Sequence, residues 1–227
     1  MKLLALDTAT EACSAALYID GQIEQRFQLA PREHTQLILT MAQELLQQAD
    51  VVVQQLDALA FGRGPGSFTG VRIATGVVQG MAYAAELPVV PVSTLAAMAW
   101  SVYREQGQQR VISAIDARMG QVYIAAYEMS ADSVQLVQAE QVIDPKDYAA
   151  PDGDWIGVGT GWGDCGEPIV AQLGKRLKQR DGEALPRADA MVQLAVEDFQ
   201  RGLAVPAAQA VPVYLRDNVA KKANPIT

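Results

Sequence analysis

The segment Gly62–Gly70 is the part of this sequence whose residue types point most directly to chemistry. It reads Gly-Arg-Gly-Pro-Gly-Ser-Phe-Thr-Gly and lies between a predicted buried strand and a predicted helix. Backbone amides and the helix dipole at such a junction favour anions, which suggests a phosphate loop. However, the lysine of a P-loop is absent, and the glycines are spaced one residue too far for the dinucleotide fingerprint. A rigid strand-to-helix turn, capped by Ser67 or Thr69, is therefore the favoured prediction over phosphate binding.

Two aspartates, Asp7 and Asp116, each end a short apolar run and precede a polar turn. When the two runs are aligned without gaps, Ala5–Asp7 falls on Ala114–Asp116, and later alanine and tyrosine positions also coincide. This pattern indicates an internal repeat of one supersecondary unit. It favours two ribonuclease H-like domains, as in actin, hexokinase and sugar kinases, where the two opening turns face each other across a nucleotide cleft.

Asp7, Thr8 and Asp116 are consequently candidates for contact with nucleotide phosphates or a metal. The turn after Asp7 has no glycine before Gly21, and a phosphate approaches the backbone less easily without one. A structural role in the turn is favoured for Asp7, and weak nucleotide binding stays open as the alternative. The later glycines between 157 and 163 form either a phosphate-facing loop or tight turns.

His34 is the single histidine of the chain, which limits the catalytic chemistry that the sequence can support. A metal site of the form HxxxH is impossible, because the residue four positions further on is Ile38. There is also no GxSxG nucleophile motif for a serine hydrolase. Cys13 and Cys165 lie far apart, in no metal or redox spacing, and are interpreted as small buried residues.

The net charge of −8 argues against tight nucleic-acid binding by this chain alone, because such proteins usually carry a basic patch. No stretch approaches the roughly 18 apolar residues of a membrane span. A cytoplasmic protein that acts on nucleic acid only through a partner therefore remains possible on composition.

The elements that must position these residues are predicted from apolar periodicity and turn signals. A hairpin is expected over 14–29, and helices are expected after Pro31, over 69–85 and over 187–200. The early hairpin argues against a doubly wound sheet, which would place a helix after its first strand. The predicted fold is an α/β protein with two domains, at 1–107 and 108–212, and with 213–227 packing back on the first.

Two helix faces are expected to contact another chain. Apolar residues recur at helical spacing in the first helix, and small residues recur in the second, where they let another backbone approach closely. The small residues serve either packing within the domain or a subunit contact. The residues predicted for the interface are His34, Leu37, Ile38, Met41, Leu45, Gly70, Ile73, Ala74, Val77, Gly80 and Met81.

Four strings give the chain a resemblance to the bacterial TsaB (YeaZ) family. They are Leu4–Thr10, Gly64–Ile73, Asp116–Tyr123 and Pro212–Arg216, so that the resemblance spans almost the whole chain. The string GPGSFTG is the most specific of the four.

The resemblance implies an actin/hexokinase-like fold and a required subunit that has no active site of its own. It implies pairing with the catalytic paralogue TsaD, which transfers a threonylcarbamoyl group to an adenosine beside the tRNA anticodon. TsaC supplies the threonylcarbamoyl-adenylate, and the pair recruits the small ATPase TsaE. ATP or ADP and a metal are then expected in TsaD and TsaE, with no cofactor in the isolated chain, and contact with tRNA is expected only through the complex. Some relatives form homodimers.

Two other functions remain as alternatives. One is a small ATPase or sugar-kinase-like enzyme, because this fold normally binds ATP. The other is a glycoprotease-like metal-dependent peptidase, against which the single histidine already argues.

Overall fold

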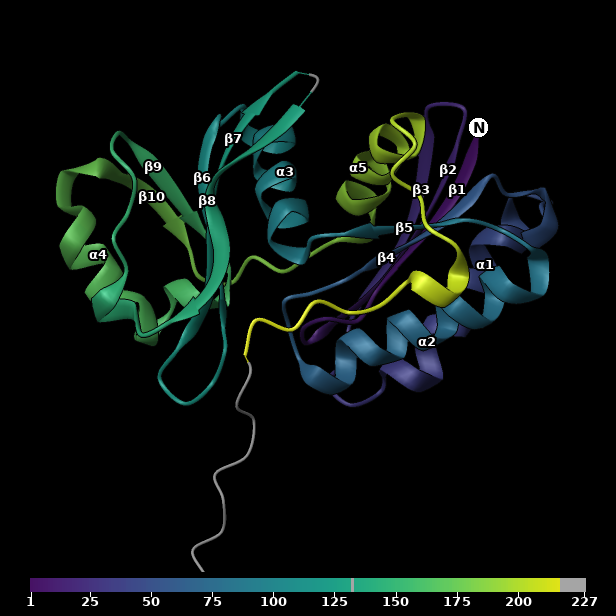
Figure 1. The fold of residues 1–227 in the computed structure, drawn as a ribbon, viewed down its shortest axis with the longest axis horizontal. Coiled ribbons are helices and arrows are strands. Elements are labelled where there is room, and N and C mark those ends of the chain that lie inside the picture. The colour runs from purple at the N-terminus through teal and green to yellow at the C-terminus, as the bar shows by residue number, and fades with distance from the viewer. Residues whose placement is uncertain (132, 217–227) are drawn as a thin grey trace, which may run out of the picture.

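The computed structural model describes residues 1–131 and 133–216 of the chain, which form two α/β domains side by side (Figure 1). The first sheet has the order β3-β2-β1-β4-β5. Within it, β1 pairs antiparallel with β2 and parallel with β4. Its strands are β1 (Lys2–Asp7), β2 (Ala12–Ile19), β3 (Gln22–Leu29), β4 (Ala58–Gly62) and β5 (Val89–Val92).

The second sheet repeats this arrangement with the order β8-β7-β6-β9-β10. Its opening strand β6 again pairs antiparallel with the second strand and parallel with the fourth. The strands are β6 (Arg110–Asp116), β7 (Val122–Ser130), β8 (Ser133–Ile143), β9 (Trp155–Val158) and β10 (Leu177–Asp181). The predicted repeat and the α/β fold with two ribonuclease H-like domains are confirmed, because both aspartates end the first strand of equivalent sheets.

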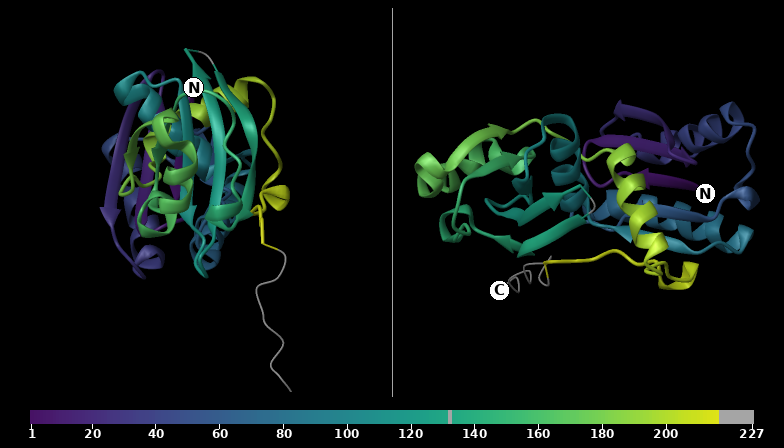
Figure 2. Two further views of the ribbon diagram at one scale, coloured as in Figure 1. Left: turned by 90° about the vertical axis from the view of Figure 1, so that its left-hand side faces the viewer. Right: turned by 90° about the horizontal axis from the view of Figure 1, so that it is seen from above.

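Within the described residues, five α-helices connect the strands. Figure 2 shows how they cover the sheets. They are α1 (His34–Gln48), α2 (Phe68–Ala85), α3 (Thr94–Gln106), α4 (Glu167–Leu173) and α5 (Ala188–Gln200). One face of β1 carries Leu4 and Leu6, which pack with α1 and α2 in one buried cluster. The opposite face carries Leu3 and Ala5, which belong to a cluster that includes α3 and α5. The alternation of the strand thus divides the first domain into two buried layers.

The last helix of each half of the chain packs on the sheet of the other half. Helix α5 contacts all five strands of the first sheet, whereas α3 contacts β6, β7 and β8 of the second. The predicted division at 107 and 212 therefore needs correction, because α3 lies on the second domain and α5 on the first. Sequence periodicity identifies the buried stripe of a helix but not which sheet covers it.

The segment after α5 runs back along the first domain and then reaches the second. Val205 forms a bridge with Val89, and the Gln79 side chain donates to the Ala210 carbonyl at 2.8 Å. The Val213 amide donates to the Arg63 carbonyl at 2.8 Å. Arg216 then donates to Gln121 of the second domain at 2.8 Å. Residues 217–227, which were also predicted to pack on the first domain, lie outside the described residues.

Candidate functional site

The glycine segment forms the tight connection between β4 and α2. Its Gly64–Pro65 peptide bond is cis, and Gly64 has a φ of +95°, a conformation that glycine adopts at little cost. Ser67 is the N-cap of α2, and its hydroxyl accepts from the Gly70 amide at 3.3 Å. The predicted strand-to-helix turn is confirmed, and of the two predicted capping residues the structure selects Ser67.

This segment packs directly on the turn that follows Asp7. The Ser67 amide donates to the Ala9 carbonyl at 2.7 Å. The Thr8 hydroxyl donates to the Gly70 carbonyl at 2.6 Å and accepts from the Ala74 amide at 3.1 Å. A Cβ atom on Gly70 would overlap the Thr8 carbonyl oxygen, and one on Gly66 would overlap that of Ala9. Both glycines are therefore needed so that two stretches of the same chain can approach closely.

Asp7 is buried behind this contact. Its side chain is shielded from solvent, and burial raises its pKa from 3.8 to about 7, although the Ala9 and Thr8 amides partly oppose this shift by hydrogen bonding to the carboxylate. Its Oδ1 atom has no hydrogen-bond partner among the described residues. The amides that could have met a phosphate are directed at the carboxylate of the same turn.

The buried carboxyl of Asp7 predicts a characteristic dependence of stability on pH. The unfolded chain loses this proton near pH 4 and the folded chain near pH 7, so the native state binds more protons between these values. The free energy of unfolding should therefore fall as pH rises from about 4 to about 7 and then level off. In the Asp7→Asn variant this slope should be lost, and at pH 8 the variant should exceed the natural chain by a few kcal/mol.

The measurement is urea denaturation at a series of pH values. Asp154→Asn is the matched control, because Asp154 is exposed and pairs with Lys178 at 3.1 Å. The control should keep the slope of the natural chain. Parallel curves for the natural chain and Asp7→Asn would show that Asp7 is already charged in the fold.

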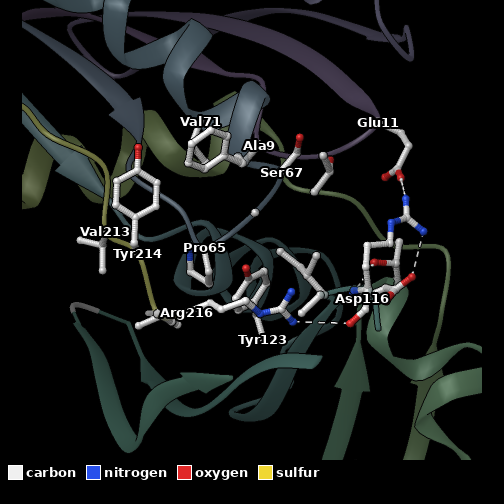
Figure 3. A pocket seen from close by; sticks show the side chains of 18 of the residues that line it. Ala9, Glu11, Pro65, Ser67, Val71, Asp116, Tyr123, Val213, Tyr214 and Arg216 are labelled. Carbon is white, nitrogen blue, oxygen red and sulfur yellow. Dashed lines mark hydrogen bonds and ion pairs between the residues drawn. The ribbon is translucent and has the colours of Figure 1, made fainter. Parts of the chain in front are cut away.

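A cleft of about 820 Å³ opens between the two domains (Figure 3). Glu11 lines it from the first domain, and Asp116 and Arg118 line it from the second. Arg118 pairs with both acids, at 3.2 Å to Glu11 and 3.0 Å to Asp116. The Arg118 side chain is largely exposed, so these ion pairs are screened by water and contribute little to stability. The pair with Glu11 crosses the cleft, whereas the pair with Asp116 lies within the second domain, where the Arg118 amide also donates to the Asp116 carboxylate at 2.7 Å.

A second, more buried ion pair joins the domains beside the glycine segment. Both Nη atoms of Arg63 donate to the Glu140 carboxylate, at 3.1 and 3.0 Å. The Tyr127 hydroxyl donates to the same carboxylate at 3.2 Å. Only 10% of the Glu140 side chain is exposed. Such a bidentate pair has a defined geometry, so it holds the end of β4 against β7 and β8.

The structure separates the three residues predicted to meet a nucleotide. Asp116 lines the cleft, whereas Asp7 and Thr8 do not. His34 also lines the cleft, but it is buried and its Nε2 lies 3.2 Å from the Ala12 carbonyl oxygen. Within residues 1–131 and 133–216, no three His, Cys, Asp or Glu side chains come together in a way that could hold a metal.

The later glycine run serves packing of the second domain. A Cβ atom on Gly157 would overlap the Trp162 ring, and one on Gly159 would overlap the Ala114 carbonyl. Trp162 is buried, and its indole nitrogen donates to the Ile112 carbonyl at 3.0 Å. Of the two interpretations of this run, the structure favours tight turns around a buried tryptophan.

Several residues predicted for the partner interface lie inside the first domain, which corrects that prediction. Ile38, Met41, Leu45 and Ala74 belong to the buried cluster beneath α1 and α2, and His34 and Gly70 are also buried. The apolar stripe of α1 marks the face that packs on its own sheet, as in most amphipathic helices. Leu37, Ile73, Val77 and Met81 are half-buried, and Gly80 is exposed.

The exposed face of α2 shares only Gly80 with the residues that were predicted for the interface on this helix. It presents Phe68, Arg72, Gly76, Gly80 and Tyr83. The first four recur every four residues and so form one row along the helix. Tyr83 is 82% exposed, although it is a large aromatic residue. The recurrence of these residues every four positions could have indicated the exposed face in the sequence. The apolar residues of the opposite face form a more conspicuous pattern, and the prediction followed that pattern.

Comparisons with known proteins identify the family. The family model described as "TsaD: tRNA N6-adenosine threonylcarbamoyltransferase" matches residues 27–224. The chain is 47% identical to a "tRNA threonylcarbamoyladenosine biosynthesis protein TsaB" of Escherichia coli, with 99% of each chain covered. It is 39% identical to the protein of the same description from Haemophilus influenzae, over 99% of this chain and 98% of that one.

A solved structure, "YeaZ from Pseudomonas aeruginosa", matches the fold with a TM-score of 0.88. It is 47% identical in sequence, and the match covers 94% of this chain and 99% of that chain. The sequence strings and the doubled fold agree with these matches. The chain belongs to the TsaB (YeaZ) family of tRNA threonylcarbamoyladenosine biosynthesis proteins.

Proposed function

We propose that this chain is a non-catalytic scaffold subunit of the complex that makes N6-threonylcarbamoyladenosine beside the tRNA anticodon. In this proposal it binds a catalytic TsaD-like paralogue and helps to recruit a TsaE-like ATPase. ATP or ADP and a metal then belong to those partners, and tRNA is contacted through the complex. The observation that carries the proposal is the exposed face of α2, which presents two glycines and a large tyrosine to solvent.

The two exposed glycines are costly for the isolated chain. Glycine within a helix is less favourable than alanine by about 1 kcal/mol, and nothing lies within 4 Å of a Cβ atom built on Gly76 or Gly80. Packing among residues 1–131 and 133–216 therefore does not explain their presence. A second helix could approach this row closely, because no side chain separates the two backbones.

The proposed lack of catalysis is supported by the contacts of the turn after Asp7. Thr8 and Ala9 are joined by hydrogen bonds to the glycine segment, and Asp7 is buried by its own turn. His34, the single histidine, is also buried. A catalytic role for Thr8 or Ala9 would require them to leave contacts that hold the turn after β1 against α2.

Co-elution tests the proposal. When the purified chain is mixed with its TsaD-like paralogue, the two should elute together from a size-exclusion column as a stable complex. Persistent separate elution, with and without ATP or ADP, would overturn the proposed role.

The alternative of an ATP-dependent enzyme is tested by titration calorimetry with ATP and magnesium. We expect no heat of binding and no hydrolysis by the isolated chain, because the Thr8 and Ala9 amides face the Asp7 carboxylate. A saturable heat, together with hydrolysis that is lost in an Asp116→Ala variant, would favour the enzyme.

No helix within the described residues is long and apolar enough to cross a membrane.

A further inference from the structure

Arg72 is held rigidly on the exposed face of α2. Its guanidinium carbon lies 3.7 Å from the centre of the Phe68 ring and 5.5 Å from that of Tyr214. Its Nε donates to the Tyr214 hydroxyl at 2.8 Å. The two rings are themselves 5.8 Å apart and tilted by 38°. An exposed arginine normally samples many rotamers, but this one is fixed between residues that are far apart in sequence.

The outer edge of this guanidinium has no hydrogen-bond or ion-pair partner among the described residues. Arg72 forms no ion pair within the described part of the chain, and its Nη1 and Nη2 atoms donate no hydrogen bond there. Phe68 and Tyr214 remain 48% and 46% exposed, so the cluster is a surface feature. A guanidinium held in place with both Nη atoms free matches the geometry of a carboxylate, which it can bind through two parallel hydrogen bonds.

The cluster continues the exposed row of α2. Arg72 precedes Gly76 and Gly80 at intervals of four residues, so the three positions lie on one face of the helix. Tyr214 adds the C-terminal segment to this face. Arginine and tyrosine are among the residue types enriched where a few residues dominate the binding energy of a protein interface.

The complementary acid is expected from a different protein. Within helices α1 and α2, the one exposed carboxylate is that of Glu44, and it already pairs with Arg26 at 3.4 Å. The corresponding helices of a second copy would therefore not supply a free acid to Arg72. A partner helix that carries an aspartate or glutamate would supply it.

We propose that Arg72, held between Phe68 and Tyr214, binds an Asp or Glu carboxylate of the catalytic paralogue. Tyr214 and the described residues beside it, 213–216, are then part of the interface. This inference rests on the proposed function, because the protein that supplies the carboxylate is the same paralogue that was proposed to bind α2. The aromatic residues reduce the entropy that the arginine loses on binding. Because the Tyr214 hydroxyl accepts from Nε of Arg72, the two Nη atoms are left to face outward.

The test measures the dissociation constant for the TsaD-like paralogue by calorimetry, at low and high salt. Arg72→Gln should weaken binding at least tenfold and should reduce its salt dependence. Arg72→Lys should also weaken it, because a lysine keeps the charge but loses the planar pair of donors. Tyr214→Phe should weaken binding severalfold. Arg180→Gln is the control, since Arg180 is an exposed arginine of the second domain that pairs with Glu167, and it should bind as the natural chain does.

The outcomes separate this inference from the proposed function. If the natural chain does not bind the paralogue, the proposed function fails. If it binds, and Arg72→Gln binds equally well with the same salt dependence, this inference alone is overturned. If Arg72→Gln changes only self-association, measured by sedimentation equilibrium, the carboxylate comes from a second copy and the assigned partner is wrong. Melting curves monitored by circular dichroism establish that each variant is folded.

Discussion

Replacing Gly80 by leucine is expected to weaken assembly with the catalytic paralogue strongly while leaving the isolated chain folded. Gly80 is exposed, and beyond its own helix turn no atom of the described residues lies within 4 Å of a Cβ atom built there, so the folded chain has room for a larger side chain. Leucine also has a higher helix propensity than glycine, by nearly 1 kcal/mol. At a close helix contact, however, the added side chain would hold the two backbones apart, which should weaken binding by roughly 100-fold.

The experiment compares size-exclusion profiles and dissociation constants with the melting curve of each variant. Ala171→Leu is the matched control, because it places the same side chain at an exposed position of α4 in the second domain. The control should assemble normally. A Gly80→Leu variant that assembles as tightly as the natural chain would show that the partner contacts another surface.

Replacing Gly70 by alanine is expected to have the opposite pattern, with a large loss of stability. A methyl group at Gly70 would overlap the Thr8 carbonyl oxygen, which is backbone and therefore cannot turn aside. Relief would require α2 to move away from β1, and the hydrogen bonds of the Thr8 hydroxyl to Gly70 and Ala74 would break. We expect the free energy of unfolding to fall by about 3 kcal/mol or more.

Gly76→Ala is the control for this prediction, since it makes the same change in the same helix. Its Cβ atom meets nothing within 4 Å, so the higher propensity of alanine should raise the free energy of unfolding by about 1 kcal/mol. Urea denaturation followed by tryptophan fluorescence measures both values. Similar effects of the two substitutions would mean that Gly70 is not in close contact with the first turn.

Local signals were sufficient to predict much of the fold. The Asp20-Gly21 turn predicts the β2–β3 hairpin, and the repeat of the apolar run with its aspartate predicts two equivalent sheets. The glycine segment was correctly predicted as a turn, because it lacks the residues that phosphate loops require. In each case the signal in the sequence is local or recurs as a pattern, although the contacts of the glycine segment with Thr8 and Ala9 are formed by residues far apart in sequence.

Features that depend on distant contacts could not be predicted in the same way. Helix α3 packs on the second sheet and α5 on the first. The apolar stripe of a helix shows which face is buried, but it does not show which of the two sheets buries it. The interface residues were mostly wrong in α1 for a related reason, since Ile38 and Leu45 lie at helical spacing because they face the sheet. The contact of Arg72 with Tyr214 joins positions 142 residues apart, so no local pattern marks it.

The central claim is that this chain is required for tRNA modification but performs no chemical step. Its most direct test is reconstitution of threonylcarbamoyladenosine synthesis from purified TsaC-, TsaD- and TsaE-like proteins and unmodified tRNA, with and without this chain. The scaffold role predicts that modification needs the chain and that Asp7→Asn and Asp116→Asn retain it, whereas Gly80→Leu loses it together with assembly. Full modification without the chain, or its loss in an Asp116→Asn variant that still assembles, would contradict the claim.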